Sequence, residues 1–286
     1  MKNTQQGTHR RWARRLGALA WTTCLASTVW AQSDGFIAKA TTAYKDLEFS
    51  REYQEFGFLG GAGNGLYKPP GDGPFPAVVL VHTCGGLQPH MSDRAKELVA
   101  AGFVVLLLDS YGPRSHRAFC QPSGVAAPRV FKDAFDALGH LATLKEVNPD
   151  RIYAVGLSLG SFAASTAASP SVAEKLGSAR RFRASVGWYG SCEFVPKMGP
   201  AWELVRPDTD RPLLLLMARN DQETPIASCF PRLEEMKAAG KPVSWHVYES
   251  ATHGWDKSMP QLGYVLDREV TKDAMARTVQ FLNAHP

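Results

Sequence analysis

The sequence predicts an α/β protein with a mostly parallel central sheet and helices on both faces. Short apolar runs alternate along the chain with longer amphipathic segments, and the first runs are apolar throughout, as strands covered on both faces are. Of the 286 residues, 44% are hydrophobic and 21% are charged. This composition suits a globular core and excludes a disordered or fibrous chain.

Strands and helices can be placed from these runs. The strands are expected at residues 77–82, 103–109, 151–156, 184–188, 212–218 and 243–248. The first helix is expected to start at Ser92, a candidate N-cap, and to end at Gly102. Further helices are expected at 130–144, directly after Ser158, and at 271–284. The stretch 190–211 has mixed polarity and three prolines, which favour a loop or a small excursion and not a separate domain.

The N-terminus has the features of an export signal. Five basic and no acidic residues lie within residues 1–31, where an apolar run at 16–30 ends in Val29-Trp30-Ala31. The run is shorter than a membrane anchor needs and is interrupted by polar residues. We therefore expect cleavage near Ala31 after export by the Sec or the twin-arginine route, which gives a secreted or periplasmic protein. Residues 32–286 then form a single domain without a stable membrane anchor.

Removal of this segment also removes the net charge of +5. The rest of the chain carries 27 Lys and Arg against 27 Asp and Glu, so no nucleic-acid partner is expected. The basic residues at 175–183 are interpreted as a solvated face.

Four cysteines remain after residue 31. In an oxidising compartment they can form two disulfides, and we expect Cys84 to pair with Cys120 and Cys192 with Cys229, since each pair lies on neighbouring loops of the predicted sheet. Buried free thiols are the alternative. The spacing of cysteines and histidines does not match a zinc site, and no metal is expected.

Residues 156–160 read GLSLG, a GxSxG sequence between a predicted strand and a predicted helix. In this context Ser158 is expected on a tight, strained turn that lifts its hydroxyl above the sheet. The flanking glycines leave room for the crossing chain, and the N-terminus of the following helix favours developing negative charge. The motif therefore predicts a nucleophilic serine.

A serine nucleophile needs a base and an acid that orients the base. Asp221 and His253 each follow a predicted strand, and the order Ser, Asp, His is that of the α/β-hydrolase fold. Because the carboxyl ends of parallel strands meet at one edge of the sheet, the three side chains are expected together. Glu223 and Glu249 are rival candidates for the acid.

The oxyanion of an acyl-transfer reaction needs hydrogen-bond donors. The N–H of Leu159 and the N–H of Cys84, or of Thr83, are expected to supply them, since the loop after the first strand contains two glycines. Cys84 as an alternative nucleophile lacks the context of the GxSxG turn.

Substrate-binding candidates follow from their position at strand ends. Arg114 is a candidate to bind a substrate carboxylate in a forked pair, although a structural pair with Asp109 or another loop acid is the alternative. Tyr111 and Trp255 are candidates to line the pocket, with simple packing as the alternative.

Five segments together resemble the dienelactone hydrolase family of α/β-hydrolases. They are HTCGGL (82–87), DSYGPRS (109–115), GLSLG (156–160), ARNDQETP (218–225) and ATHGW (251–255). The resemblance spans residues 55–285 and implies Ser158 as nucleophile, Asp221 as acid and His253 as base. The family's namesake enzymes use a cysteine nucleophile with a nearby glutamate, so this chain is most similar to the exported branch with a serine nucleophile.

We therefore expect a serine hydrolase that cleaves carboxylic esters or lactones through an acyl-enzyme and needs no cofactor. Its partner is a small-molecule substrate. A serine peptidase or amidase on the same fold is the first alternative, and a non-catalytic binding protein is the second. The sequence leaves the oligomeric state and the natural substrate open.

Overall fold

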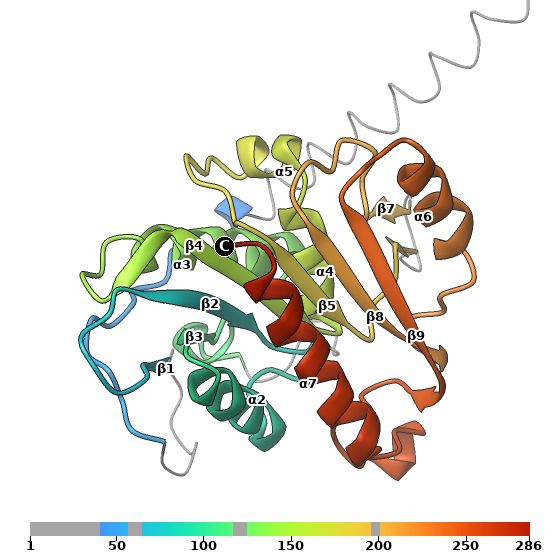
Figure 1. Ribbon diagram of the computed structural model, residues 1–286, viewed down its shortest axis with the longest axis horizontal. Coiled ribbons are helices and arrows are strands. Elements are labelled where there is room, and N and C mark those ends of the chain that lie inside the picture. Colours follow the sequence, from blue (N-terminus) through green and yellow to red (C-terminus); the bar gives the residue numbers. More distant parts are fainter. Residues whose placement is uncertain (1–40, 57–64, 117–124, 196–200) are drawn as a thin grey trace, which may run out of the picture.

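Seven strands form one sheet in the part of the chain that the computed structural model describes, residues 41–56, 65–116, 125–195 and 201–286 (Figure 1). The order across the sheet is β1-β3-β2-β4-β5-β8-β9, and every neighbouring pair is parallel except β1 with β3. The strands are β1 (Gly65–Tyr67), β2 (Phe75–Val81), β3 (Val104–Leu108), β4 (Val147–Leu157), β5 (Ser185–Trp188), β8 (Leu213–Asn220) and β9 (Val243–Thr252). This arrangement confirms the predicted α/β-hydrolase fold.

Helices cover both faces of this sheet. One face packs against α2 (Pro89–Ala100) and α7 (Arg268–Asn283), which lie in front of the sheet in Figure 1. The other face packs against α3 (Ala127–Leu141), α4 (Leu159–Ala167) and α6 (Cys229–Ala238). The remaining short helices are α5 (Pro170–Lys175), η1 (Gly112–Arg114) and η2 (Pro260–Leu262).

The double covering explains why the strands are apolar throughout. In β2, Val79 and Val81 join the core under α3 and α4, whereas Val78 and Leu80 join the core under α2 and α7. Successive side chains of a strand point to opposite faces, so a polar residue at either position of β2 would be buried. All four of these side chains are fully buried.

One local expectation was wrong. Helix α2 begins at Pro89 after Gln88, and Ser92 lies buried inside the helix instead of capping it. Proline is well suited to the first position of a helix because its missing N–H has no helical acceptor there. The stretch expected to be a loop or a small excursion contains a short antiparallel pair of strands, β6 (Glu193–Phe194) and β7 (Trp202–Glu203).

The parallel strands bring four loops to one edge of the sheet. Ser158 follows β4, Asp221 follows β8 and His253 follows β9, while the loop 82–86 follows β2, the neighbour of β4. This edge carries the candidate site, as expected for the carboxyl ends of strands in an open α/β sheet.

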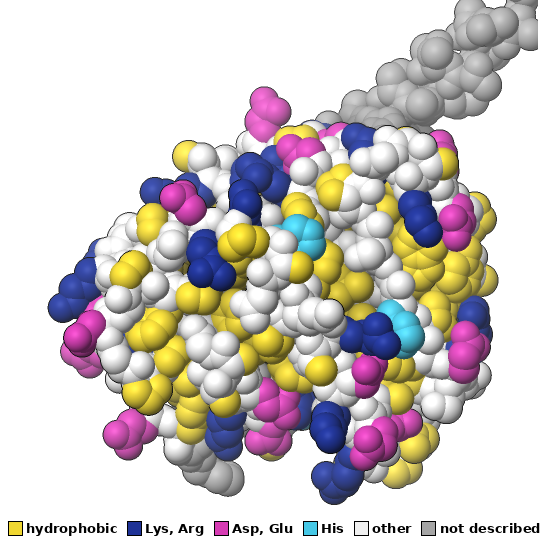
Figure 2. Space-filling view, in the orientation of Figure 1, with side chains coloured by type: hydrophobic (Ala, Val, Ile, Leu, Met, Phe, Trp, Pro, Cys, Tyr) yellow, Lys and Arg dark blue, Asp and Glu magenta, His cyan; other side chains and the backbone are white. Residues whose placement is uncertain are grey.

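The surface carries charges of both signs. Figure 2 shows Lys and Arg side chains interspersed with Asp and Glu side chains over the face that bears α2 and α7. Of the expected solvated basic group, Arg181 is paired with Asp210 at 2.7 Å. Among the described residues, none of the helices has the length and apolar character needed to span a bilayer.

Candidate active site

Ser158 lies on a strained turn between β4 and α4. Its φ of 54° is in the left-handed region, which costs a non-glycine residue about 1–3 kcal/mol. The flanking glycines make the turn sterically possible: a Cβ on Gly156 would overlap the Gly160 carbonyl, and a Cβ on Gly160 would overlap the Val81 carbonyl. The chain therefore presses α4 closely against β2 and β4 and holds the serine at their junction.

A chain of hydrogen bonds connects Ser158 with the two other predicted side chains. Ser158 Oγ lies 2.9 Å from His253 Nε2, and His253 Nδ1 lies 2.8 Å from Asp221 Oδ2. All three residues are buried, with exposed fractions of 4–6%. The imidazole that donates from Nδ1 to the carboxylate has a free lone pair on Nε2, which faces the serine hydroxyl.

Asp221 is held by further donors from its own loop. The backbone N–H groups of Glu223 and Thr224 donate to Oδ1 at 3.0 and 2.8 Å, and the Thr224 hydroxyl donates to Oδ2 at 2.8 Å. These hydrogen bonds to both carboxylate oxygens fix the orientation of Asp221. Thr224 had no predicted role, since its side chain is recognisable as an orienting group only once the loop conformation is known.

The two rival acids occupy other positions. Glu249 is exposed and forms a forked pair with Arg219, with both contacts at 2.9 Å. Glu223 lies beside the histidine, but its Oε2 is 3.4 Å from Nε2, the nitrogen that faces Ser158. Neither carboxylate is within hydrogen-bond distance of Nδ1 in the structure, so the contact geometry favours Asp221 as the orienting acid.

The loop after β2 forms a tight turn next to Ser158. The Gly86 N–H donates to the Thr83 carbonyl at 3.0 Å, and Gly86 has a φ of 75°. Leu159 is the first residue of α4, so its N–H has no acceptor within the helix. The expected oxyanion donors, Cys84 and Leu159, thus lie on adjoining elements.

His82, which precedes this turn, supports it from inside. Its Nε2 accepts from the Ser110 N–H at 3.1 Å, and its Nδ1 lies 2.7 Å from the Thr83 carbonyl. Burial lowers the pKa of the imidazole. The neutral ring, which donates from Nδ1 and accepts at Nε2, matches both contacts.

One of the two predicted disulfides lies within the described residues. The predicted disulfide between Cys192 and Cys229 is confirmed, with Cα atoms 5.1 Å apart. It joins the segment after β5 to the start of α6 and so brackets the Asp221 loop, and such a bond is typical of an oxidising compartment. Cys84 is also disulfide-bonded, which removes the thiolate a cysteine nucleophile needs. Cys120 lies outside the described residues, so its pairing with Cys84 stays a prediction.

The contacts of Arg114 and Tyr111 are structural. The guanidinium of Arg114 binds both carboxylate oxygens of Asp133 at 2.7 and 3.0 Å, and these side chains are only 4% and 0% exposed. The forked pair expected for a substrate is therefore occupied by a loop-to-helix contact, although with Asp133 and not with Asp109. Tyr111 is 1% exposed and packs its ring on His82 at 4.4 Å. Both side chains already contact protein groups that a substrate would have to displace.

Trp255 lies behind the histidine and has no exposed surface. Its ring contacts Trp188, Tyr189 and Tyr248, with ring centroids 4.8–6.0 Å apart. These contacts agree with the packing alternative for Trp255.

Tyr189 connects His253 with a buried ion pair. Its ring stands edge-on to His253 with centroids 5.1 Å apart, and its hydroxyl donates to Asp256 Oδ1 at 3.0 Å. Asp256 Oδ2 lies 3.4 Å from Arg94. Burial and the neighbouring Asp256 raise the pKa of the tyrosine far above its ordinary value, so the phenol stays protonated and donates.

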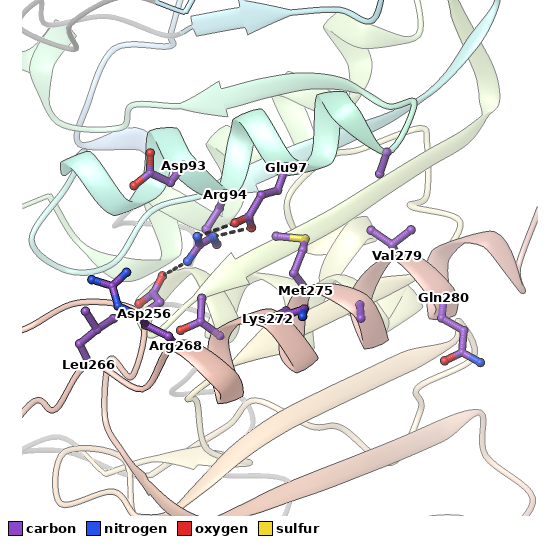
Figure 3. Close-up of a pocket in the computed structure, with 13 residues that line it drawn as sticks. Asp93, Arg94, Glu97, Asp256, Leu266, Arg268, Lys272, Met275, Val279 and Gln280 are labelled. Atoms are coloured by element: carbon purple, nitrogen blue, oxygen red, sulfur yellow. Dashed lines mark hydrogen bonds and ion pairs between the residues drawn. The ribbon is translucent and has the colours of Figure 1, made fainter.

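The Arg94–Asp256 pair also lines a groove between α2 and α7 (Figure 3). The groove has a volume of about 840 Å³ and includes Glu97, Arg268 and Lys272 among its lining residues. None of Ser158, Asp221 and His253 lines it, so this groove is separate from the candidate active site. Within the described ranges, no group of three or more His, Cys, Asp or Glu side chains is arranged to hold a metal ion.

Two curated proteins are similar to parts of this chain. A protein named a probable 2-oxo-3-(5-oxofuran-2-ylidene)propanoate lactonase, from Bradyrhizobium sp., is 28% identical over 137 residues, which cover 45% of this chain and 51% of that protein. The esterase EstD of Thermotoga maritima is 34% identical over 116 residues, which cover 37% of this chain and 26% of that protein. The chain thus spans about half and about a quarter of these relatives.

Comparison with solved structures and with family models extends this similarity. Thermogutta terrifontis esterase 2 superposes with a TM-score of 0.59 at 18% identity, over 77% of this chain and 88% of that one. At this identity the likeness shows the fold alone. The model of the dienelactone hydrolase family matches residues 64–286, which include every residue of the hydrogen-bonded chain described above. The protein therefore belongs to the dienelactone hydrolase family.

Proposed function

We propose that this protein is a serine hydrolase that cleaves carboxylic esters or lactones of small molecules, with Ser158, His253 and Asp221 as nucleophile, base and acid. The observation that carries the proposal is the continuous hydrogen-bonded chain from Ser158 Oγ through His253 to Asp221 Oδ2, at 2.9 and 2.8 Å. The family membership and the lactonase and esterase names of the curated relatives support it.

In the first half of the reaction, His253 Nε2 accepts the proton of Ser158 as Oγ attacks the carbonyl carbon. Asp221 accepts the hydrogen bond from His253 Nδ1–H and stabilises the imidazolium that forms. The N–H groups of Leu159 and Cys84 stabilise the oxyanion of the tetrahedral intermediate. The imidazolium then donates its proton to the leaving alcohol oxygen, and the acyl-enzyme remains.

In the second half, water attacks the acyl-enzyme with His253 as base, and the acid product leaves with Ser158 restored. The step needs only residues that are already in place. The strained backbone of Ser158 keeps its Oγ aimed at the histidine in both halves, so little reorganisation is required.

We also propose export before function. Residues 1–31 carry the predicted signal peptide and lie outside the described residues, as does the predicted cleavage site at Ala31. The Cys192–Cys229 disulfide supports this localisation because such bonds are rare in reducing compartments.

The test is hydrolysis of p-nitrophenyl acetate and a long-chain p-nitrophenyl ester by residues 32–286, compared with Ser158→Ala under oxidising conditions. The wild type is expected to turn over at least one ester, and the variant to lose all but background activity. Equal rates for the two proteins would overturn the assignment of Ser158. A folded wild type that cleaves only amides would favour the amidase alternative.

A further inference from the structure

A negatively charged side chain stands at the reacting atoms of the proposed site. Glu223 Oε2 lies 3.4 Å from His253 Nε2, the same nitrogen that is 2.9 Å from Ser158 Oγ. Its side chain is 42% exposed, so Glu223 is partly open to solvent beside the buried histidine.

Tyr264 fixes this carboxylate in place. The Tyr264 hydroxyl donates to Glu223 Oε1 in a short hydrogen bond, and its ring packs on His253 with centroids 5.2 Å apart. Tyr264 is 6% exposed, and it is anchored by a pair of backbone hydrogen bonds with Met259, both 3.2 Å long. Burial and the Glu223 carboxylate raise the pKa of the phenol, so it stays a donor.

Lys257 is a cation near Glu223, and its ammonium is hydrogen-bonded to another residue. The Lys257 ammonium donates to Gln88 Oε1 at 3.2 Å and lies 5.2 Å from the Tyr264 ring centroid. Burial lowers its pKa, which Glu223 and Asp256 partly offset. The guanidinium of Arg114, which the sequence suggested for a substrate carboxylate, is bound to Asp133.

The position of Glu223 determines which part of a substrate it meets. The leaving-group oxygen must come within about 3 Å of Nε2 to receive its proton. The leaving-group oxygen then lies within about 6 Å of Glu223 Oε2. Substituents on the alcohol side of the substrate are therefore near the Glu223 carboxylate. Two negative charges about 6 Å apart at a partly exposed site repel enough to lower a rate constant by about threefold to tenfold.

We propose that Glu223, held by Tyr264, is a specificity-determining residue that selects esters and lactones with an uncharged or cationic alcohol side and rejects those with a carboxylate there. This inference rests on the proposed hydrolase function. It concerns the step in which the imidazolium protonates the leaving oxygen and the alcohol departs, because the Glu223 carboxylate is near the alcohol part of the substrate at that moment.

The experiment uses two pairs of acetate esters that match in shape and differ in charge. Acetoxyacetate is compared with acetoxyacetamide, and acetylcholine with 3,3-dimethylbutyl acetate. All four form the same acetyl-enzyme, so differences in kcat/KM report on the acylation step. Acetic acid release is followed for the wild type, for Glu223→Gln, and for Glu249→Gln as a control that removes an exposed carboxylate at Arg219.

In the wild type, kcat/KM is expected to favour the amide over the carboxylate ester and acetylcholine over its neutral analogue. Glu223→Gln is expected to reduce the amide-to-carboxylate ratio by about threefold to tenfold, whereas Glu249→Gln leaves both ratios unchanged. Unchanged ratios in Glu223→Gln, or an equal loss of rate for all four esters, would overturn the inference. Preference of the wild type for acetoxyacetate would do the same.

A measurement on the unmodified protein covers the case in which Glu223→Gln does not fold. Salt screens exposed charges, so kcat/KM for acetoxyacetate is expected to rise relative to acetoxyacetamide between low and high ionic strength. A ratio independent of salt contradicts the inference. If the wild type cleaves none of the four esters and Ser158→Ala is equally inert on the p-nitrophenyl esters, the proposed function fails and the inference fails with it.

Discussion

The ring of Tyr189 stands edge-on to the imidazole of His253, with centroids 5.1 Å apart and planes inclined by 70°. Tyr189 is one of three described non-glycine residues with positive φ, at 37°. Its carbonyl lies 3.2 Å from the Thr224 hydroxyl, which also contacts Asp221. One strained residue thus supports the base with its ring and the acid loop with its backbone.

Tyr189→Phe should weaken this support. The change keeps the ring but leaves the buried Asp256 without one of its donors, so the free energy of unfolding is expected to fall by about 1–3 kcal/mol. We expect kcat to fall severalfold because the ring beside His253 is no longer anchored through its hydroxyl. Tyr153→Phe is the matched control, since its hydroxyl donates to the His285 carbonyl. Denaturant unfolding and ester kinetics check both variants. A loss of kcat as large in Tyr153→Phe as in Tyr189→Phe would argue against a role specific to the site.

Asp221→Asn should leave the fold intact and remove most of the activity. The amide of Asn can donate a hydrogen bond to Nδ1, which allows the imidazole tautomer with its proton on Nε2. In that tautomer Nε2 cannot accept the proton of Ser158. The equivalent change in serine proteases costs about 10⁴ in kcat, and a loss of this order is expected here. If instead Glu249→Gln were the more damaging of the two substitutions, the assignment of the acid would be incorrect.

Arg114→Met tests the structural interpretation of Arg114. Removal of one partner of a buried ion pair destabilises a protein by about 3–5 kcal/mol. We expect the free energy of unfolding to fall by about 3 kcal/mol, the lower end of this range, because Asp133 still has Arg129 as a partner at 2.7 Å. The ratio of kcat/KM between acetoxyacetamide and acetoxyacetate should not change. A selective loss of carboxylate-ester hydrolysis in a stable variant would instead identify Arg114 as a substrate ligand.

His90 should make stability depend on pH. Burial, aided by Lys257 and Arg94 and opposed by Asp256, lowers the pKa of His90 from 6.5 to about 4. The unfolded chain therefore binds a proton at His90 more readily than the folded protein does. The contribution of neutral His90 to the stability of the fold is complete above pH 6.5 and is lost as the pH falls from 6.5 to about 4. The contribution is at most about 3 kcal/mol. In denaturant unfolding, His90→Gln is expected to flatten the profile in this range, and a profile with unchanged slope would contradict the prediction.

The features that follow strict local rules were predictable from sequence. Continuous apolar runs such as that of β2 identify the covered parallel strands, and the GxSxG turn places Ser158 because only glycines fit at 156 and 160. The start of α2 was missed because Ser92 and Pro89 are both good start signals, and the buried position of Ser92 is set by packing against the sheet.

The contacts around His253 depend on the folding of loops, which carry no periodic signal. Tyr264 lies eleven residues after His253 in a segment without a recognisable motif, yet its hydroxyl contacts Glu223. In the same way, the sequence placed Glu223 near the site as a rival acid but could not tell which imidazole nitrogen it would face. A structural ion pair was the predicted alternative for Arg114, and the structure agrees with it. The partner, Asp133, could not be predicted because it lies on a helix that only the folded chain brings close to the loop of Arg114.

The close approach of α4 to β2 and β4 limits which residues the turn of this chain can hold. A side chain at 156 or 160 has no space because backbone carbonyls stand where its Cβ would be, and backbone cannot yield as a flexible side chain can. Gly139, in α3, is a different case, since a Cβ there would meet no atom within 4 Å. Under random mutagenesis with selection for a folded product, the two glycines of the turn should tolerate no replacement, whereas position 139 should accept alanine freely and gain helix stability of up to about 1 kcal/mol.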